Sequence, residues 1–170
     1  MTADTLEPYR ISASDMEAFG IAPGWTFGAK VRVRWSDLDA FGHANHKSHL
    51  TWFEDIRNSY LQAGGYPIRN AAHPGPVLRN ITCSYEKSAE LDQQLMVTAK
   101  TDWIGRTSFG MSYATWHDGL VAHGTAVCIW HVNQTRRSEP VPATLRAFML
   151  ALDNAADKLA VENSGAGQQS

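Results

Sequence analysis

The spacing of hydrophobic and polar residues predicts a strand near residue 30 and a long helix after it. Val31, Val33 and Trp35 alternate with Lys and Arg residues, which is the period of a half-buried strand. A polar loop, 36–45, follows. Beyond it, apolar residues recur at helical spacing at Leu50, Phe53, Ile56, Tyr60 and Leu61. This pattern predicts an amphipathic helix of about four turns, which Gly64 and Gly65 end.

The chain from residue 76 to about 133 predicts an antiparallel sheet rich in hairpins. Four strands are expected, at 76–87, 93–104, 107–117 and 120–133, and Asp118-Gly119 is a two-residue hairpin signal between the last two. Both faces of the last strand carry apolar side chains, so both should be covered. One helix covers only one face, so we expect a second copy of the chain or the terminal segments to cover the other.

The two ends of the chain are expected to lie outside the main domain. We interpret 1–24 as an accessory segment with a short helix that opens at Ser12 or Ser14 and closes near Gly20. The range 25–160 forms one domain, whose last helix starts after Pro142 with Thr144 as its cap and runs to about residue 159. The tail, 161–170, is expected to be disordered.

Composition narrows the class of protein. With 170 residues, 44% of them hydrophobic, and a net charge of -2, the chain fits one globular core and carries no basic field for nucleic acid. The first residues lack the basic flank and apolar run of a signal peptide, and no apolar stretch is long enough to span a bilayer. We therefore expect a cytoplasmic protein without membrane partners. Cys83 and Cys128 are expected to be buried thiols without a role.

The loop before the long helix carries the candidate chemistry. Two carboxylates, a glycine and two histidines fall within residues 36–46, next to the predicted helix N-terminus. Free backbone N–H groups and the helix dipole favour negative charge at such an end, so an oxyanion formed from a carbonyl would be stabilised there. An acyl-transfer site is therefore physically reasonable at this loop.

The motif in this loop resembles that of a known family. The residues Asp37-x-Asp39-x-x-Gly42-His43-x-Asn45-His46, followed by Leu50-x-x-Phe53-Glu54-x-x-Arg57, resemble the signature of the 4-hydroxybenzoyl-CoA thioesterase-like branch of the hot-dog superfamily. The likeness covers roughly 28–150. It implies an α+β hot-dog fold, in which a curved antiparallel sheet of five or six strands wraps around one long central helix. It also implies a homodimer, which many members pair into a homotetramer.

The resemblance also assigns roles to residues. It implies that Asp39 is the catalytic carboxylate, acting as nucleophile on the thioester or as general base for water. It places the oxyanion donor at the backbone N–H of His46. The His46 imidazole would orient water or protonate the departing thiolate, or else lie exposed near the helix cap. The implied reaction is hydrolysis of an acyl-CoA to a free acid and coenzyme A.

The other candidate residues each have a structural alternative. Asn45 is expected to cap the helix and so keep the oxyanion site in register. His43 would either touch the substrate or be a buried histidine, and Trp52 would line an acyl pocket or belong to the core. Arg106, in a strand turn, would bind the phosphates of coenzyme A or be a solvated charge. Asp37 would support Asp39 or cap a turn.

Further pairs and rivals follow from the same residues. Glu54 and Arg57 are placed to form a side-chain pair on the helix. His43, His46 and His49 recur every third residue and suggest a metal, but structural zinc more commonly uses cysteine, so we expect no metal and no cofactor beyond the coenzyme A of the substrate. Two rival functions keep the fold: a hydratase or dehydratase acting on a beta-hydroxyacyl thioester, and a non-catalytic acyl-CoA-binding protein. The acyl group stays open.

Overall fold

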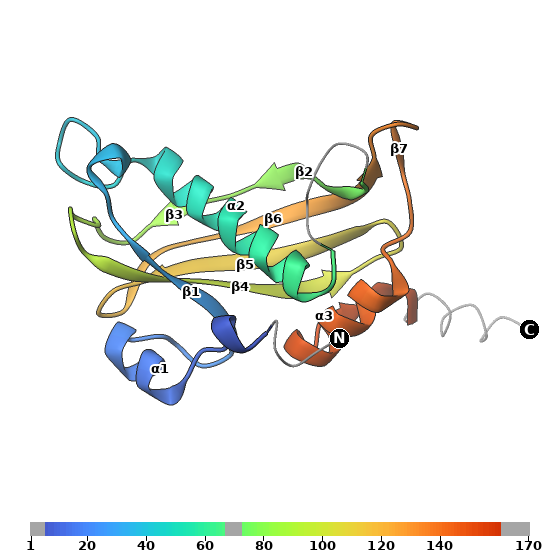
Figure 1. The fold of residues 1–170 in the computed structure, drawn as a ribbon, viewed down its shortest axis with the longest axis horizontal. Coiled ribbons are helices and arrows are strands. Elements are labelled where there is room, and N and C mark those ends of the chain that lie inside the picture. Colours follow the sequence, from blue (N-terminus) through green and yellow to red (C-terminus); the bar gives the residue numbers. More distant parts are fainter. Residues whose placement is uncertain (1–5, 67–72, 161–170) are drawn as a thin grey trace, which may run out of the picture.

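A curved antiparallel sheet holds one long helix against its concave face in the computed structural model, which describes residues 6–66 and 73–160 (Figure 1). The elements, in chain order, are α1 (Ala13–Phe19), β1 (Phe27–Arg32), α2 (His46–Ala63), β2 (Gly75–Ile81), β3 (Ser84–Tyr85), β4 (Gln94–Ile104), β5 (Ser108–Trp116), β6 (Leu120–Val132), β7 (Arg137–Ser138), α3 (Ala143–Asp153) and β8 (Ala156–Asp157). The main strands lie in the order β1-β4-β5-β6-β2, and β3, β7 and β8 are short additions. The predicted hot-dog architecture is confirmed.

The predicted strands agree with the observed ones to within a few residues, except that one predicted strand is observed as two. Asp118 and Gly119 have φ of 49° and 101°, the two left-handed residues that a tight hairpin turn between β5 and β6 requires. The strand expected over 76–87 is divided into β2 and β3, and its register against β6 shifts between Leu78 and Asn80. This bulge lies within β2, where it leaves one residue unpaired and bends the strand, and the break between β2 and β3 comes after it, at residues 82 and 83.

The prediction that Trp35 continues the first strand is wrong. The strand β1 ends at Arg32, and Trp35–Asp37 forms a 3-10 turn in which the Trp35 side chain is 79% exposed. The carboxylate of Asp37 accepts a hydrogen bond from the backbone N–H of Arg34 at 2.8 Å. That contact closes the turn and redirects the chain, which overrides the alternating pattern.

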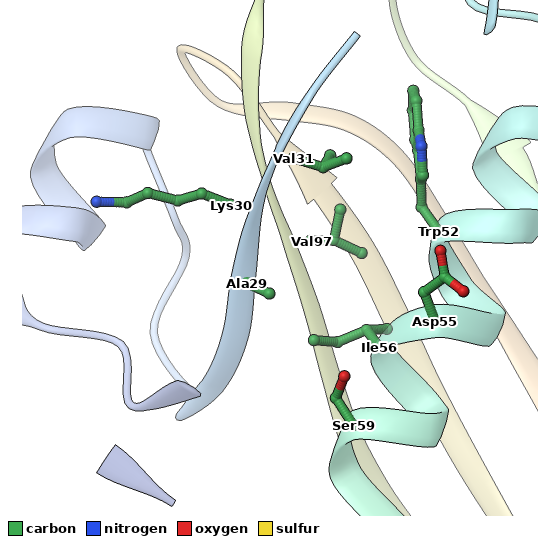
Figure 2. A pocket seen from close by; sticks show the side chains of 8 residues that line it. All are labelled: Ala29, Lys30, Val31, Trp52, Asp55, Ile56, Ser59 and Val97. Carbon is green, nitrogen blue, oxygen red and sulfur yellow. The ribbon is translucent and has the colours of Figure 1, made fainter. Parts of the chain in front are cut away.

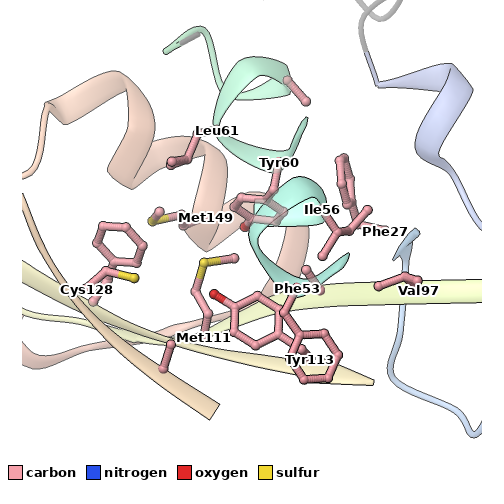
Figure 3. Close-up of a cluster of buried hydrophobic side chains, with 14 of the residues drawn as sticks. Phe27, Phe53, Ile56, Tyr60, Leu61, Val97, Met111, Tyr113, Cys128 and Met149 are labelled. Carbon is pink, nitrogen blue, oxygen red and sulfur yellow. The ribbon is translucent and has the colours of Figure 1, made fainter. Parts of the chain in front are cut away.

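The core lies between α2 and the sheet. Phe53, Ile56, Tyr60 and Leu61 of the predicted helical stripe are buried there (Figure 3). Phe53 stacks on Tyr113 of β5 with ring centroids 5.1 Å apart. The helix spans 18 residues, so it starts one turn earlier than its apolar stripe suggested. Among the described residues, no helix combines the length and the hydropathy that a membrane span requires.

The last helix is shorter than predicted. It ends at Asp153 rather than near residue 159, because Asn154 adopts a left-handed conformation with φ of 52° and the following β8 pairs in parallel with β4. Thr144 is not the cap, since Pro142 holds that position and the Thr144 hydroxyl lies 2.9 Å from the Tyr66 hydroxyl. The expected disordered tail, 161–170, lies outside the described residues.

The N-terminal segment covers part of the convex face of the sheet. Its helix is as predicted, since Ser12 forms a capping box with Asp15, and Gly20 ends the helix at φ of 65°. Phe19 and Ile21 pack with residues of β4 and β5 that point away from α2, namely Met96, Ala114 and Trp116. The second face of the sheet was expected to be covered by a second copy of the chain or by the terminal segments. The N-terminal segment covers at least part of it.

Replacing Gly20 by alanine is expected to loosen this segment. A Cβ at Gly20 would lie 2.5 Å from the backbone nitrogen of Gly119, and its φ of +65° disfavours any side chain. We expect the free energy of unfolding to fall by about 2 to 4 kcal/mol, from backbone strain and overpacking together. Urea unfolding measures it.

Gly24→Ala is the matched control. Gly24 has φ of +93°, but a Cβ added there would meet no atom of the described residues within 4 Å, so this variant carries only the backbone strain. We expect it to cost about 1 to 2 kcal/mol. Equal losses for the two variants would contradict the close approach of α1 to the hairpin turn.

Candidate active site

The loop that carries the motif is a tight turn tied to the sheet margin. The backbone N–H of Asp39 donates to the carbonyl of His43 at 2.9 Å, and that of Gly42 donates to the carbonyl of Asp39 at 3.1 Å. Gly42 has φ of 82°, a value that glycine adopts without strain. The N–H of Ala44 donates to the carbonyl of Ala89 at 2.8 Å, which anchors the loop beside the start of β4.

The two carboxylate oxygens of Asp39 have different surroundings. Oδ1 accepts hydrogen bonds from the backbone N–H groups of Phe41 at 2.8 Å and His43 at 3.4 Å. In the part of the chain that the structure describes, Oδ2 has no hydrogen-bond partner. One oxygen therefore fixes the side chain in the loop, and the other stays available for chemistry.

The start of α2 leaves one backbone donor unused. Asn45 caps the helix as predicted, with its Oδ1 accepting from the N–H of Lys47 at 3.1 Å. The N–H of Ser48 donates to the carbonyl of Asn45 at 2.9 Å. Within 6–66 and 73–160, the N–H of His46 has no partner. It is the group that the helix N-terminus offers to a developing negative charge.

A cleft of about 450 Å³ brings three of the predicted site residues together. Asp39, His43, His46 and His49 line one side, and residues 85–88 line the other. Asn45 lies next to it as the helix cap. The structure thus gathers in one cavity the carboxylate, the helix end and the imidazoles that the sequence pointed to.

Two predicted binding residues lie outside this cleft. Trp52 is only 6% exposed and meets the cleft through its ring contact with His49, at 4.9 Å between centroids. Arg106 lies in the turn between β4 and β5, at the opposite end of the sheet from the loop (Figure 1). In one chain, Arg106 is therefore separated from Asp39 by the length of β4.

Two other expectations for polar residues are resolved by their contacts. Asp37 has a structural role, because its carboxylate closes the 3-10 turn and its carbonyl accepts from the Asn45 N–H at 2.8 Å and the Ser48 hydroxyl at 2.9 Å. The predicted pair of Glu54 and Arg57 is not among the ion pairs of the described residues. Arg57 is buried and instead donates to the Tyr113 hydroxyl at 3.3 Å.

His49 is a cleft residue that the sequence interpretation considered only as a metal ligand. Its side chain is 2% exposed and lies between the rings of Trp52 and Tyr85, at 4.9 and 5.3 Å. Its Nδ1 is buried without a hydrogen-bond partner among the described residues. The helical spacing from His46 could have placed it at the cleft. In 6–66 and 73–160, no three His, Cys, Asp or Glu side chains are grouped to hold a metal ion.

The burial of His49 is expected to make stability depend on pH. Burial lowers the pKa of His49 from 6.5 to about 4. Between these values the unfolded chain binds a proton that the folded protein does not, so stability is lost as the pH falls, by about 1.4 kcal/mol per unit. Urea unfolding at several pH values measures the slope. His49→Phe should flatten it, and an unchanged slope would contradict this assignment.

Comparison with known proteins places the chain among thioesterases. A solved thioesterase-superfamily structure from Jannaschia sp. CCS1 is 30% identical, with a TM-score of 0.74 over 84% of this chain and 92% of the other. A thioesterase from Thermus thermophilus, solved with coenzyme A and Zn, is 25% identical, with a TM-score of 0.65 over 78% and 98%. The Bacillus subtilis protein YsmA is 29% identical over 89 residues, 52% of this chain and 60% of that protein.

A family model also matches more than half of the chain. It spans residues 33–149, from the end of the first strand through the motif loop, α2 and the sheet to α3. The loop with Asp39, the helix start and the cleft all fall inside that range. The chain belongs to the Thioesterase-like superfamily.

Proposed function

We propose that this chain hydrolyses an acyl-CoA thioester to a free acid and coenzyme A. The observation that carries the proposal is that two groups beside one cleft have no hydrogen-bond partner among the described residues. These groups are the Oδ2 atom of Asp39 and the backbone N–H of His46. A carboxylate that acts on a carbonyl carbon and a donor that receives the carbonyl oxygen are the two groups that thioester hydrolysis needs. Membership of a thioesterase superfamily supports the same reaction class.

In the proposed mechanism the thioester carbonyl oxygen accepts a hydrogen bond from the His46 N–H. Asp39 Oδ2 then attacks the carbonyl carbon, or removes a proton from a water molecule that attacks it. The carbon–sulfur bond breaks, and the thiolate of coenzyme A leaves and takes up a proton. In the first route, water then cleaves the acyl-aspartate anhydride. The His46 imidazole, which lines the cleft, is a proton donor for the thiolate.

Coenzyme A as the thiol carrier is part of this proposal. The Thermus thermophilus thioesterase was solved with coenzyme A, and the family match covers the site residues of this chain. We propose no cofactor beyond the coenzyme A of the substrate. His43 and Asn45 act as supporting residues, one lining the cleft and the other holding the helix start. Arg106 would bind coenzyme A only if the bound coenzyme reached the β4–β5 turn, at the opposite end of the sheet from Asp39.

Thiol release from a panel of acyl-CoA esters tests the function. The panel contains short, long and aromatic acyl groups, and we expect turnover of at least one. No turnover on any member would refute the proposal. Hydration of crotonyl-CoA without thiol release would point instead to a hydratase, and tight binding of acyl-CoA without hydrolysis would point to a binding protein.

We also propose that the chain forms a homodimer, with pairing into tetramers as a further step. β2 is an edge strand of the sheet, so one side of its backbone has no strand partner in the described part of the chain. Its side chains Val77 and Leu78 are 48% and 39% exposed. An open edge with apolar side chains is a template for pairing with a second copy. Sedimentation equilibrium tests this, and a monomer at high concentration would contradict it.

A further inference from the structure

A second cavity lies along the same helix as the cleft. It is a groove of about 180 Å³ between α2 and the strands β1 and β4. Its apolar walls come from both layers, as Figure 2 shows, and include Ala29, Val31, Trp52, Ile56 and Val97. Nothing in the proposed mechanism uses this groove.

The helix makes the cleft and the groove neighbours. His46 and His49 line the cleft, whereas Trp52, Ile56 and Ser59 line the groove. These five residues follow one another at spacings of three, three, four and three, so each is a neighbour of the next on the surface of α2, in a row that winds partly around the helix. An acyl chain that extends from a carbonyl at the His46 N–H along this row would reach the groove.

Trp52 and His49 form the wall between the two cavities. Their rings meet edge to face, with centroids 4.9 Å apart and an interplanar angle of 64°. Both side chains are buried, at 6% and 2% exposed. A wall of two packed rings stops an acyl chain at this point, because close-packed side chains leave no passage.

We propose that Trp52 determines the acyl-chain length by closing off the groove, which is the distal part of the acyl subsite. The native protein would then prefer short acyl groups, and a smaller residue at position 52 would admit longer ones. This inference rests on the proposed thioesterase function, because it assigns a specificity-determining residue to that same site.

The groove also indicates the kind of chain it would admit. Its walls are mainly aliphatic, and Asp55 and Ser59 supply its polar side (Figure 2). The Lys30 side chain points away from the groove, toward α1, where its Nζ lies 2.9 Å from the carboxylate of Asp15. With a carboxylate present and this cation turned away, a neutral alkyl chain fits better than one that ends in a carboxylate.

The test compares chain-length profiles of the native protein, Trp52→Ala and Trp52→Leu. The substrates run from acetyl-CoA through butanoyl-, hexanoyl- and octanoyl- to dodecanoyl-CoA, and kcat/KM is measured by thiol release. We expect the native value to fall for the longer chains. In Trp52→Ala, kcat/KM for the longer acyl groups should rise about fourfold for each methylene that enters the groove. The ratio between substrates does not depend on how much protein is folded, and the leucine variant gives a smaller shift should the alanine variant fold poorly.

Two further variants serve as controls. Trp130→Ala removes another buried tryptophan, 2% exposed and packed on Tyr66 at 5.5 Å, away from the groove, and should leave the profile unchanged. Adding Ala29→Leu to Trp52→Ala refills the groove and should restore the preference for short chains.

The outcomes separate the two proposals. An active protein whose profile is the same in the native form and both Trp52 variants, or a native preference for dodecanoyl-CoA, overturns the role of Trp52 and leaves the thioesterase function standing. A native protein inactive on every ester overturns the function and this inference together.

Discussion

Replacing Asp39 by asparagine is expected to lower kcat/KM for thiol release by roughly 10² to 10⁴-fold, the contribution typical of a positioned acid or base. Asparagine keeps an oxygen that accepts the hydrogen bond now made by Phe41 N–H to Oδ1 at 2.8 Å. The turn should therefore persist, while the charge on the second oxygen is lost. Thiol release by the purified variant measures the rate, and urea unfolding checks that the fold is retained.

Asp37→Asn is the matched control for this variant. It removes a second carboxylate from the same loop, but one whose Oδ2 closes a turn by accepting from the Arg34 N–H. We expect a small loss of stability and a rate within a few-fold of the native protein. Equal losses of rate in the two variants, or a fully active Asp39→Asn, would refute the role assigned to Asp39.

Replacing Phe53 by alanine is expected to lower the free energy of unfolding by about 3 to 5 kcal/mol. The side chain is fully buried, at 0% exposed, and stacks on Tyr113 with an interplanar angle of 18°. Its loss removes apolar burial and leaves a cavity between α2 and β5, which close-packed neighbours fill only in part. Urea unfolding followed by circular dichroism measures the change.

Phe41→Ala makes the same chemical change at an exposed position. Phe41 is 86% exposed, so we expect the free energy of unfolding to change by less than about 0.5 kcal/mol. A loss at Phe53 no larger than that at Phe41 would contradict the packing of α2 on the sheet.

Local patterns predicted most of the architecture. Residues Leu50 to Leu61 gave the helix because helical spacing repeats over several turns, and Asp118-Gly119 gave a hairpin because few residue pairs adopt two left-handed conformations. Asn45 was predicted as the cap from residue type and position alone. The motif around Asp39 located the cleft because the whole site loop is contiguous in sequence.

Contacts between distant segments account for the rest. The end of α3 depends on β8 pairing with β4, and the bulge within β2 depends on the register of that strand against β6, neither of which local periodicity contains. The turn at Trp35 depends on one side-chain contact from Asp37. The surroundings of His49 depend on Tyr85 of β3, so its burial and lowered pKa needed the tertiary structure.

The packing of α1 on the convex face bears on how copies of the chain can associate. The N-terminal segment buries Met96, Ala114 and Trp116, which would otherwise form an exposed apolar patch on the convex face of the sheet. If two copies of the chain packed with their convex faces together, α1 would form part of the interface, and the uncovered strands would form the rest. Deleting residues 1–24 would expose that patch to solvent, so a protein shortened in this way should be prone to aggregation.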